Sequence, residues 1–491
     1  MPLRFSSENR PSSLAMILTT VLLYFVVLFA ISRWSSRRAT NATFFRGERR
    51  SPWWLVAFGM VGASISGVTF VSVPGMVLTS AMTYLQLCMG FILGYLAIAF
   101  VLLPVYYKLS LTSIYSYIGG RLGRSSYLTS VWFFMLSKMA GAALKFYVVC
   151  IILQRFVFDG WGVPFAVTVL GLVLLIWLYT RWGGIRTLVF TDTFQTFCLF
   201  SALVLIIWQV ITAMNLSITE AMTSVWADER SRIFVFDDWW SPKCFWKQLL
   251  SGMFIVIVMT GLDQDMMQKN LTCRTLRDAQ KDMCSYGVAF LPANFLFLVL
   301  GVLLAQLFES QGVSLPAKGD ELLPLFVQAS TEGGATSGVV VLLFVIGIVA
   351  ASFSSADSAL TSLTTCYCID IRRQQEDERL RRLSHSLICL LFALAILLFH
   401  SVNSTSLIDA IYTMVSYTYG PLLGLFAYGL FTRRGVRDAW VPWVCVASPL
   451  LCYLTNLLAQ QLFSYRFDYE LLLLNGLFTF LGLWLSAYRK P

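Results

Sequence analysis

The chain has 491 residues, of which 57% are hydrophobic and only 13% are charged. An average soluble domain carries roughly 25% charged residues, and apolar runs long enough to cross a bilayer recur from end to end, so a soluble enzyme is excluded. The net charge of +10 comes from short loops between apolar runs and not from one basic face, which excludes a nucleic-acid-binding surface. The 11 cysteines lie mostly inside apolar segments, so neither a disulfide framework nor a zinc site is indicated.

Apolar stretches of roughly 17 residues or more predict helices that cross a membrane. The first stretch is too long for the apolar part of a signal peptide, and it continues into Arg33, Arg37 and Arg38 without a small-residue cleavage site. We therefore expect a retained helix there. The thirteen spans that we predict are 14–32, 53–79, 83–107, 126–155, 161–179, 187–213, 247–267, 283–309, 335–369, 385–402, 404–430, 439–462 and 469–487.

The basic residues predict the orientation, because short loops rich in Lys and Arg stay on the cytoplasmic side. Of the 36 basic residues, 25 fall in one alternating set of loops and nine in the opposite set, while Lys138 and Lys145 lie inside the fourth span. We therefore expect the N-terminus outside and the C-terminus in the cytoplasm. The basic set consists of 33–52, 106–125, 180–186, 268–282, 370–384, 432–437 and the tail 488–491.

The second expected span carries small and polar residues near its middle, from Gly62 to Thr69, and then Pro74 and Gly75. An interruption of a membrane helix is tolerated where it lines a cavity or binds something, and broken helices at mid-membrane expose carbonyl oxygens to ions. Small residues also allow two helices to pack closely. The segment predicts either an ion-binding break or a packing surface.

The ninth expected span places Ala351, Ser354, Ser355 and Ser358 on one helical face, because they follow the i, i+3, i+4, i+7 spacing. Hydroxyl oxygens in a stripe suit a hard cation. Serines in membrane helices also bond back to their own helix. Asp357 beside them is costly in hydrocarbon and needs a partner, which favours the cation interpretation.

Asp192 lies about one to two turns inside the cytoplasmic end of the sixth span, after Gly183 and Gly184. It could be interfacial. By the expected topology, however, it shares the inner half of the membrane with Ser354 to Ser358, so these residues could meet at one site.

The seventh span ends in a polar segment from Thr260 to Lys269 that contains Gly261, Asp263 and Asp265. The glycine and the two acids are compatible with a helix break or a gate. Because the segment falls at the cytoplasmic end of the span, we favour an ordinary solvated helix terminus.

Taken together, these residues resemble the sodium:solute symporter family, relatives of bacterial sugar and sialic acid symporters, over nearly the whole chain. The specific elements are the pattern from Gly183 to Gln195, the segment Gly62 to Thr69, and the pair Ser354 and Ser355. The resemblance implies an all-α polytopic membrane protein with a LeuT-like fold in a single domain over 1–491. It places a leading helix at 14–32, inverted repeats at 53–213 and 247–430, and trailing helices at 439–487.

The resemblance also implies cation sites. A second sodium would draw on Asp192, Ser354 and Ser358, and Asp357 stands where the family is expected to carry a small hydroxyl or apolar residue. Asp357 would either strengthen this second site or titrate and couple a proton. The principal sodium site would consist of the carbonyl groups of Gly62, Ile65 and Ala351 and the hydroxyl groups of Ser354 and Ser355.

Several polar groups could converge on a solute near the midplane. Lys138 and Lys145 lie on roughly one face of the fourth span, where one ammonium could pair with an internal carboxylate and the other could receive an anionic solute. Lys145 could instead extend toward the lipid headgroups. The other candidates are Ser64, Ser66, Thr69 and Gln86.

The expected function is sodium-coupled symport of a small polar organic solute, such as a sugar, a sugar acid like sialic acid, or another carboxylate, by alternating access. A proton-coupled symporter, a solute sensor and a channel on the same scaffold are the alternatives. An enzyme is disfavoured, since the two histidines, His385 and His400, form no catalytic motif. We expect a multi-pass protein of the plasma (inner) membrane that binds sodium ions, its solute and lipid, without nucleic acid or an obligate protein partner.

Overall fold

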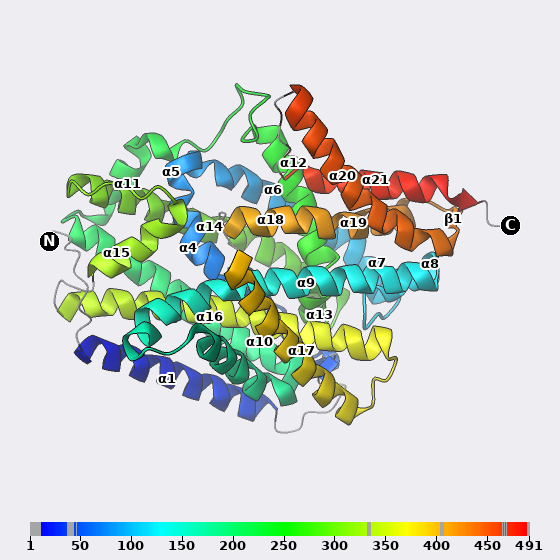
Figure 1. Cartoon of the computed structure of the whole chain (residues 1–491), viewed down its shortest axis with the longest axis horizontal. Helices are drawn as coiled ribbons and strands as arrows, with labels where there is room; N and C mark the ends of the chain where they lie inside the picture. The colour runs from blue at the N-terminus through cyan, green and yellow to red at the C-terminus, as the bar shows by residue number, and fades with distance from the viewer. Residues whose placement is uncertain are drawn as a thin grey trace.

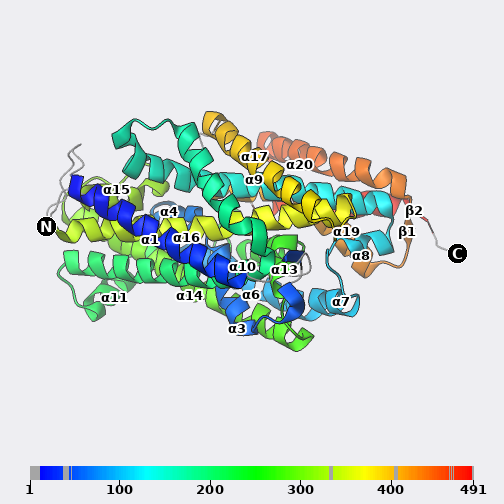
Figure 2. The ribbon, with the colours of Figure 1, turned by 90° about the horizontal axis from the view of Figure 1, so that it is seen from below.

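The computed structural model describes residues 11–36, 44–45, 47–330, 335–402, 407–463, 465, 467 and 469–488. The regular structure of these residues is almost entirely helical; it also includes a short antiparallel pairing of β1 (Gly435–Val436) with β2 (Ala487–Tyr488) and an isolated bridge between Ser51 and Cys273. The described chain begins with α1 at one end of the long axis and finishes with β2 at the other (Figure 1, Figure 2). Parts of the expected loop 33–52 and the first residues of the expected span 404–430 lie outside the described residues.

The first half of the chain contains one leading helix and the helices that surround the first break. In chain order these are α1 (Pro11–Ser35), α3 (Trp53–Ser64), α4 (Gly67–Gly75), α5 (Val77–Ser80), α6 (Tyr84–Ala97), a π-helical turn η3 (Ile98–Leu102), α7 (Leu103–Lys108), α8 (Ser116–Arg121), α9 (Arg124–Leu153), α10 (Phe165–Ala213) and the short α11 (Ile218–Ala227).

The second half likewise begins with a broken helix, which longer helices follow. It consists of α12 (Phe245–Val256), a π-helical turn η7 (Ile257–Gly261), α13 (Gln264–Asn270), α14 (Leu276–Ser310), α15 (Leu322–Ser330), α16 (Ala335–Cys366), η9 (Tyr367–Ile371), α17 (Glu378–Val402), α18 (Leu407–Thr418), α19 (Gly420–Phe431), α20 (Val441–Phe463) and α21 (Leu471–Leu485).

The helices carry enough apolar length for a multi-span membrane protein. Within the described ranges, eight helices are long and apolar enough to cross a membrane, or nine if the bent pair Phe245–Gly261 and Gln264–Asn270 counts as one span. Four shorter apolar helices, Trp53–Ser64, Phe165–Arg181, Gly420–Phe431 and Leu471–Leu485, cover parts of further expected spans. The all-helical class is confirmed, while the number thirteen stays a prediction.

The connection between the fifth and sixth expected spans is a kink and not a loop. Helical structure continues through α10, and Gly184 alone departs from it with φ 52° and ψ −144°. This positive φ favours glycine. A Cβ at Gly184 would also overlap Phe44, so the bend needs a residue without a side chain.

Glycines bring α6 and α12 into direct backbone contact. A Cβ at Gly90 would overlap the carbonyl of Leu249, and one at Gly252 would overlap the carbonyl of Leu87. A Cβ at Gly94 would likewise meet the carbonyl of Met253. We call these three glycines the glycine seam; they join the first half of the chain to the second.

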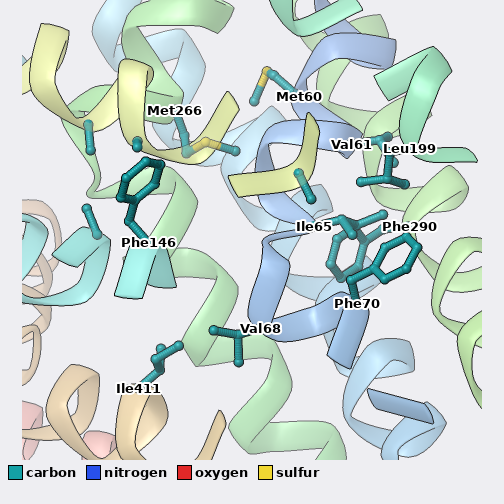
Figure 3. Packing of buried hydrophobic residues seen from close by; sticks show 14 of the residues in the cluster. Met60, Val61, Ile65, Val68, Phe70, Phe146, Leu199, Met266, Phe290 and Ile411 are labelled. Atoms are coloured by element: carbon teal, nitrogen blue, oxygen red, sulfur yellow. The ribbon is translucent and has the colours of Figure 1, made fainter. Parts of the chain in front are cut away.

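Apolar side chains form one continuous core around the break between α3 and α4. In Figure 3, Met60 and Val61 belong to α3, Ile65 lies at the break, and Phe70 belongs to α4. Phe70 makes an edge contact with Phe297 of α14 at 5.4 Å between ring centroids. This core fixes the break between α10, α14 and α16.

Candidate cation and solute sites

Helix α3 stops at Ser64, where the backbone of Ile65 becomes extended (φ −79°, ψ 100°). A new helix, α4, then starts behind Ser66, whose hydroxyl caps it by accepting a hydrogen bond from the Thr69 amide. The last carbonyl groups of a helix lack intrahelical partners. The break expected from the run of small residues is therefore confirmed, and it leaves carbonyl oxygens at the end of α3 available.

Helix α16 lies against this end of α3. Ser355 Oγ donates a hydrogen bond to the Ala63 carbonyl at 2.8 Å and lies 3.2 Å from the Ala351 carbonyl. A Cβ at Gly67 would overlap Ser352 Oγ, so the start of α4 is equally close to α16. The structure thus brings together the two segments that carry the expected principal site, the end of α3 with Gly62 and Ile65 and the hydroxyl face of α16.

Both hydroxyl protons of this face are already committed to acceptors. Ser354 Oγ donates to Asp192 Oδ1 at 2.7 Å, while Ser355 Oγ donates to the backbone. A hydroxyl oxygen that donates its proton keeps lone pairs for other partners. Each oxygen therefore donates its proton to a protein acceptor and keeps lone pairs with which it could bind a cation.

Asp192 also faces a basic residue that the sequence did not single out. Lys269 Nζ lies 2.7 Å from Asp192 Oδ2, and each side chain is 1% exposed. Asp192 is fully inside the bundle, so its interpretation as an interfacial residue is wrong. Its two oxygens are shared between the Ser354 hydroxyl and the Lys269 ammonium.

Asp357 has a different environment. Tyr179 donates a hydrogen bond to Asp357 Oδ2 at 2.7 Å, and no basic group in the described ranges lies within ion-pair distance of this carboxylate. The hydroxyl of Ser358 is buried and has no hydrogen-bond partner within the described ranges. Of the four residues of the expected second site, Asp192 and Ser354 therefore bond each other. Among the described residues, Asp357 has no ion-pair partner and Ser358 has no hydrogen-bond partner.

The end of the seventh expected span is a second break, buried within the bundle. Helices Phe245–Gly261 and Gln264–Asn270 meet at 71°, and Asp263 caps the second by accepting from the Asp265 amide at 2.9 Å. All residues of α13 are buried. The interpretation of this segment as a solvated helix terminus is wrong, because the turn at Gly261 folds it back into the protein.

A cavity of about 130 Å³ lies beside both breaks. A water molecule takes up about 30 Å³ in the liquid, so the cavity has room for several. Val68, Met266, Phe290 and Ile411, all labelled in Figure 3, are among its apolar lining residues. Its polar lining includes Ser64, Ser66, Thr69, Lys138, Lys145, Asp263, Asp265 and Ser355.

The two lysines of α9 have different roles in this cavity. Lys138 Nζ lies 3.1 Å from Asp263 Oδ2 and 2.7 Å from Asp265 Oδ2, and Tyr419 donates to Asp263 Oδ2 at 2.7 Å. Lys145 lines the cavity without an ion pair or hydrogen bond to any described residue. Pairing of one lysine with internal carboxylates is therefore confirmed for Lys138, and Lys145 faces the cavity and not the lipid headgroups.

The remaining solute candidates differ in their placement. Ser64 bonds the hydroxyl of Tyr286, and Ser66 and Thr69 lie at the start of α4. Gln86 does not belong to the described cavity lining. Its amide donates to the Lys243 carbonyl at 2.9 Å and accepts from the Val235 amide at 3.1 Å, so it holds the segment before α12.

Comparison with known proteins agrees with this geometry. The sequence pattern of the Sodium:solute symporter family matches residues 44–438. The sodium/sialic acid symporter SiaT of Proteus mirabilis (strain HI4320) is 25% identical over 435 residues, which cover 84% of this chain and 84% of that protein. The sodium/iodide cotransporter of Homo sapiens is 24% identical over 425 residues, which cover 82% of this chain and 62% of that protein.

Solved structures show the same fold. A substrate-bound, outward-open Na+-coupled sialic acid symporter superimposes with a TM-score of 0.80 at 21% identity, covering 96% of this chain and 99% of the other. A transporter of the nucleobase-cation-symport-1 family in a closed conformation gives 0.51 at 14% identity, covering 90% and 94%. The structural match supports a LeuT-like fold, and the family pattern spans most of the sequence. The chain is therefore an integral multi-pass transporter that belongs to the sodium:solute symporter family.

Proposed function

We propose that this protein is a symporter that uses sodium to carry a small organic anion, by alternating access. One observation carries the proposal: Ala63, Ser64 and Ser355 line the cavity that we assign to the solute, and the same segments carry the expected cation ligands between α3 and α16. The two expected sites therefore share part of their lining residues. Occupation of one site therefore changes the shape of the other.

The cation chemistry supports sodium at the principal site. Carbonyl oxygens at the end of α3 and the lone pairs of Ser354 and Ser355 form an all-oxygen ligand set, which hard cations prefer. A cation there ties α3 to α16 more firmly than the single hydrogen bond from Ser355 to Ala63. Since coupling between two binding sites is reciprocal, sodium and solute should raise each other's affinity.

The solute chemistry follows from Lys145. This ammonium faces a partly apolar cavity and has no hydrogen-bond or ion-pair partner among the described residues, so its donors are unfilled. A carboxylate on the solute would fill them. The aromatic residues Tyr84, Phe91 and Tyr412 offer apolar surface for the rest of the molecule. We therefore place the solute among small carboxylates, sugar acids included.

The topology is part of the same proposal. The two breaks fall in the first helices of the expected repeats 53–213 and 247–430, one after α3 and one after α12. This correspondence supports a duplicated plan with thirteen spans. We place the N-terminus outside and the C-terminus in the cytoplasm because of the distribution of basic residues.

The test is uptake into proteoliposomes. Purified protein is first screened by thermal shift against sugars, sugar acids, amino acids and short carboxylates, with and without sodium, because a bound ligand stabilises the fold by mass action. The radiolabelled hit is then offered to vesicles with an inward sodium gradient. Accumulation above the external concentration supports symport, whereas equilibration alone indicates a channel and binding without flux indicates a sensor.

Lys145→Gln should raise the solute concentration for half-maximal uptake about tenfold, because a charge-assisted hydrogen bond of about 1.5 kcal/mol is lost. The sodium concentration for half-maximal uptake should change far less. Lys145→Arg, which keeps the charge, is the matched control. Uptake that is unchanged in the Gln variant, or a preference for an uncharged solute, would remove Lys145 from the binding site.

A further inference from the structure

The ammonium of Lys269 is buried at the expected second sodium site, where a bound sodium ion would otherwise balance the charge of Asp192. It is one of the largest fully buried side chains of the protein, and it contacts Asp192, a residue of the expected second sodium site, at 2.7 Å. A buried charge is costly unless it is paired. The fold itself therefore places this ammonium beside Asp192.

The fold fixes the position of Lys269 independently of any ligand. The 71° turn before α13 directs this helix between α3, α10 and α16. Gln268 then anchors it, since its amide donates to the Phe45 carbonyl at 2.8 Å and to Thr365 Oγ1 at 3.1 Å. Lys269 thus comes from the second half of the chain to meet Asp192 of the first half.

The charges of the site leave room for one more cation. Asp192 and Asp357 are the carboxylates of the expected second site, and Lys269 is its one described base. The adjoining acids Asp263 and Asp265 are matched in charge by Lys138 and Lys145 of the same cavity. The ligands of the principal site are neutral oxygens. With both Asp192 and Asp357 ionised, the ammonium of Lys269 leaves one negative charge. One sodium ion at the principal site balances it, whereas two would leave a buried net positive charge, which is unfavourable in a low-dielectric interior.

We infer that the ammonium of Lys269 is a tethered cation that takes the place of a second sodium ion at Asp192. Each transport cycle then carries one sodium ion, bound between α3 and α16. The inference rests on the proposed function, because it concerns the number of ions that the proposed symporter binds. Lys269 acts here as a residue that determines ion stoichiometry.

Equilibrium binding of radioactive sodium to the purified full-length protein tests this inference without knowledge of the solute. We expect one ion for each wild-type chain and a binding curve with a Hill coefficient of one. Lys269→Ala removes the tethered charge and leaves Asp192 and Ser354 available, so the number of bound ions should rise from one to two. Lys269→Arg keeps the charge and should bind one ion.

The double variant Lys269→Ala/Asp192→Asn should return to one ion, because it removes the carboxylate of the second site together with its ammonium. Two ions bound by the wild type, or one ion bound by a folded Lys269→Ala variant, would overturn the inference and leave sodium symport intact. Absence of sodium binding in the wild type would instead overturn the proposed function. A wild type that binds two ions overturns the inference by itself, so the inference stays falsifiable even if a variant fails to fold.

Discussion

Ser355→Ala is expected to raise the sodium concentration for half-maximal uptake by about tenfold to a hundredfold. The substitution removes one oxygen from the expected ligand set and also the hydrogen bond that joins α16 to the Ala63 carbonyl. Interactions of this kind with a charged group contribute about 1.5–3 kcal/mol, which corresponds to this range of affinity. Sodium-dependent uptake, and sodium binding to the purified protein, measure it.

A suitable control lies two turns further along the same helix. Ser362 is buried like Ser355, but its hydroxyl bonds back to the Ala359 carbonyl of α16 at 2.9 Å. Ser362→Ala therefore removes the same atom from the same kind of surroundings and should leave the sodium constant unchanged. Ser355→Thr keeps the hydroxyl and should retain most of the affinity. A wild-type sodium constant in Ser355→Ala would exclude a sodium site on this face.

Lys138→Met should destabilise the protein by about 3–5 kcal/mol, the usual cost of removing one partner from a buried ion pair. It leaves Asp263 and Asp265 facing each other at the second break without their shared ammonium. Their side chains are only 3% and 5% exposed, so bulk water solvates them poorly. The loss should appear as a clear drop in the thermal unfolding temperature of the purified protein in detergent.

An exposed ion pair of similar length provides the control for Lys138. Arg232 lies 2.8 Å from Asp237, but these side chains are 56% and 71% exposed, and exposed pairs contribute about 0–1 kcal/mol. Arg232→Met should therefore barely change the unfolding temperature. The double variant Lys138→Met/Asp265→Asn should be less destabilised than Lys138→Met alone. If Lys138→Met unfolds like the wild type, the two carboxylates are not held as ions by Lys138.

The features that could be predicted from the sequence are those that local composition encodes. The glycines and serines from Gly62 to Ser66 marked the first break, because such residues are unusual in the middle of an apolar helix. The spacing of Ser354 and Ser355 predicted their common face, and Asp192 was correctly expected to lie near them. Each of these predictions needed only the period of a helix and the cost of polar groups in a membrane.

The features that were missed depend on where a segment goes after it bends. Lys269 follows an apolar run and precedes more basic residues, so by composition it belonged to a cytoplasmic loop. The turn at Gly261 reverses that assignment, and the only signal for it in the sequence was the glycine beside the two acids Asp263 and Asp265. The prediction for Gln86 erred in the opposite direction. Gln86 was expected inside the cavity, but its side chain bonds a loop outside it.

The glycine seam limits how the two halves of the chain can work together. At Gly90 and Gly252 the peptide groups of α6 and α12 touch without side chains between them, so no layer of side chains is present over which one helix could slide. We therefore expect α6 and α12 to move together as one rigid unit. A displacement of the end of α12 that leads through η7 to the break with Asp263 and Asp265 should then move α6 as well.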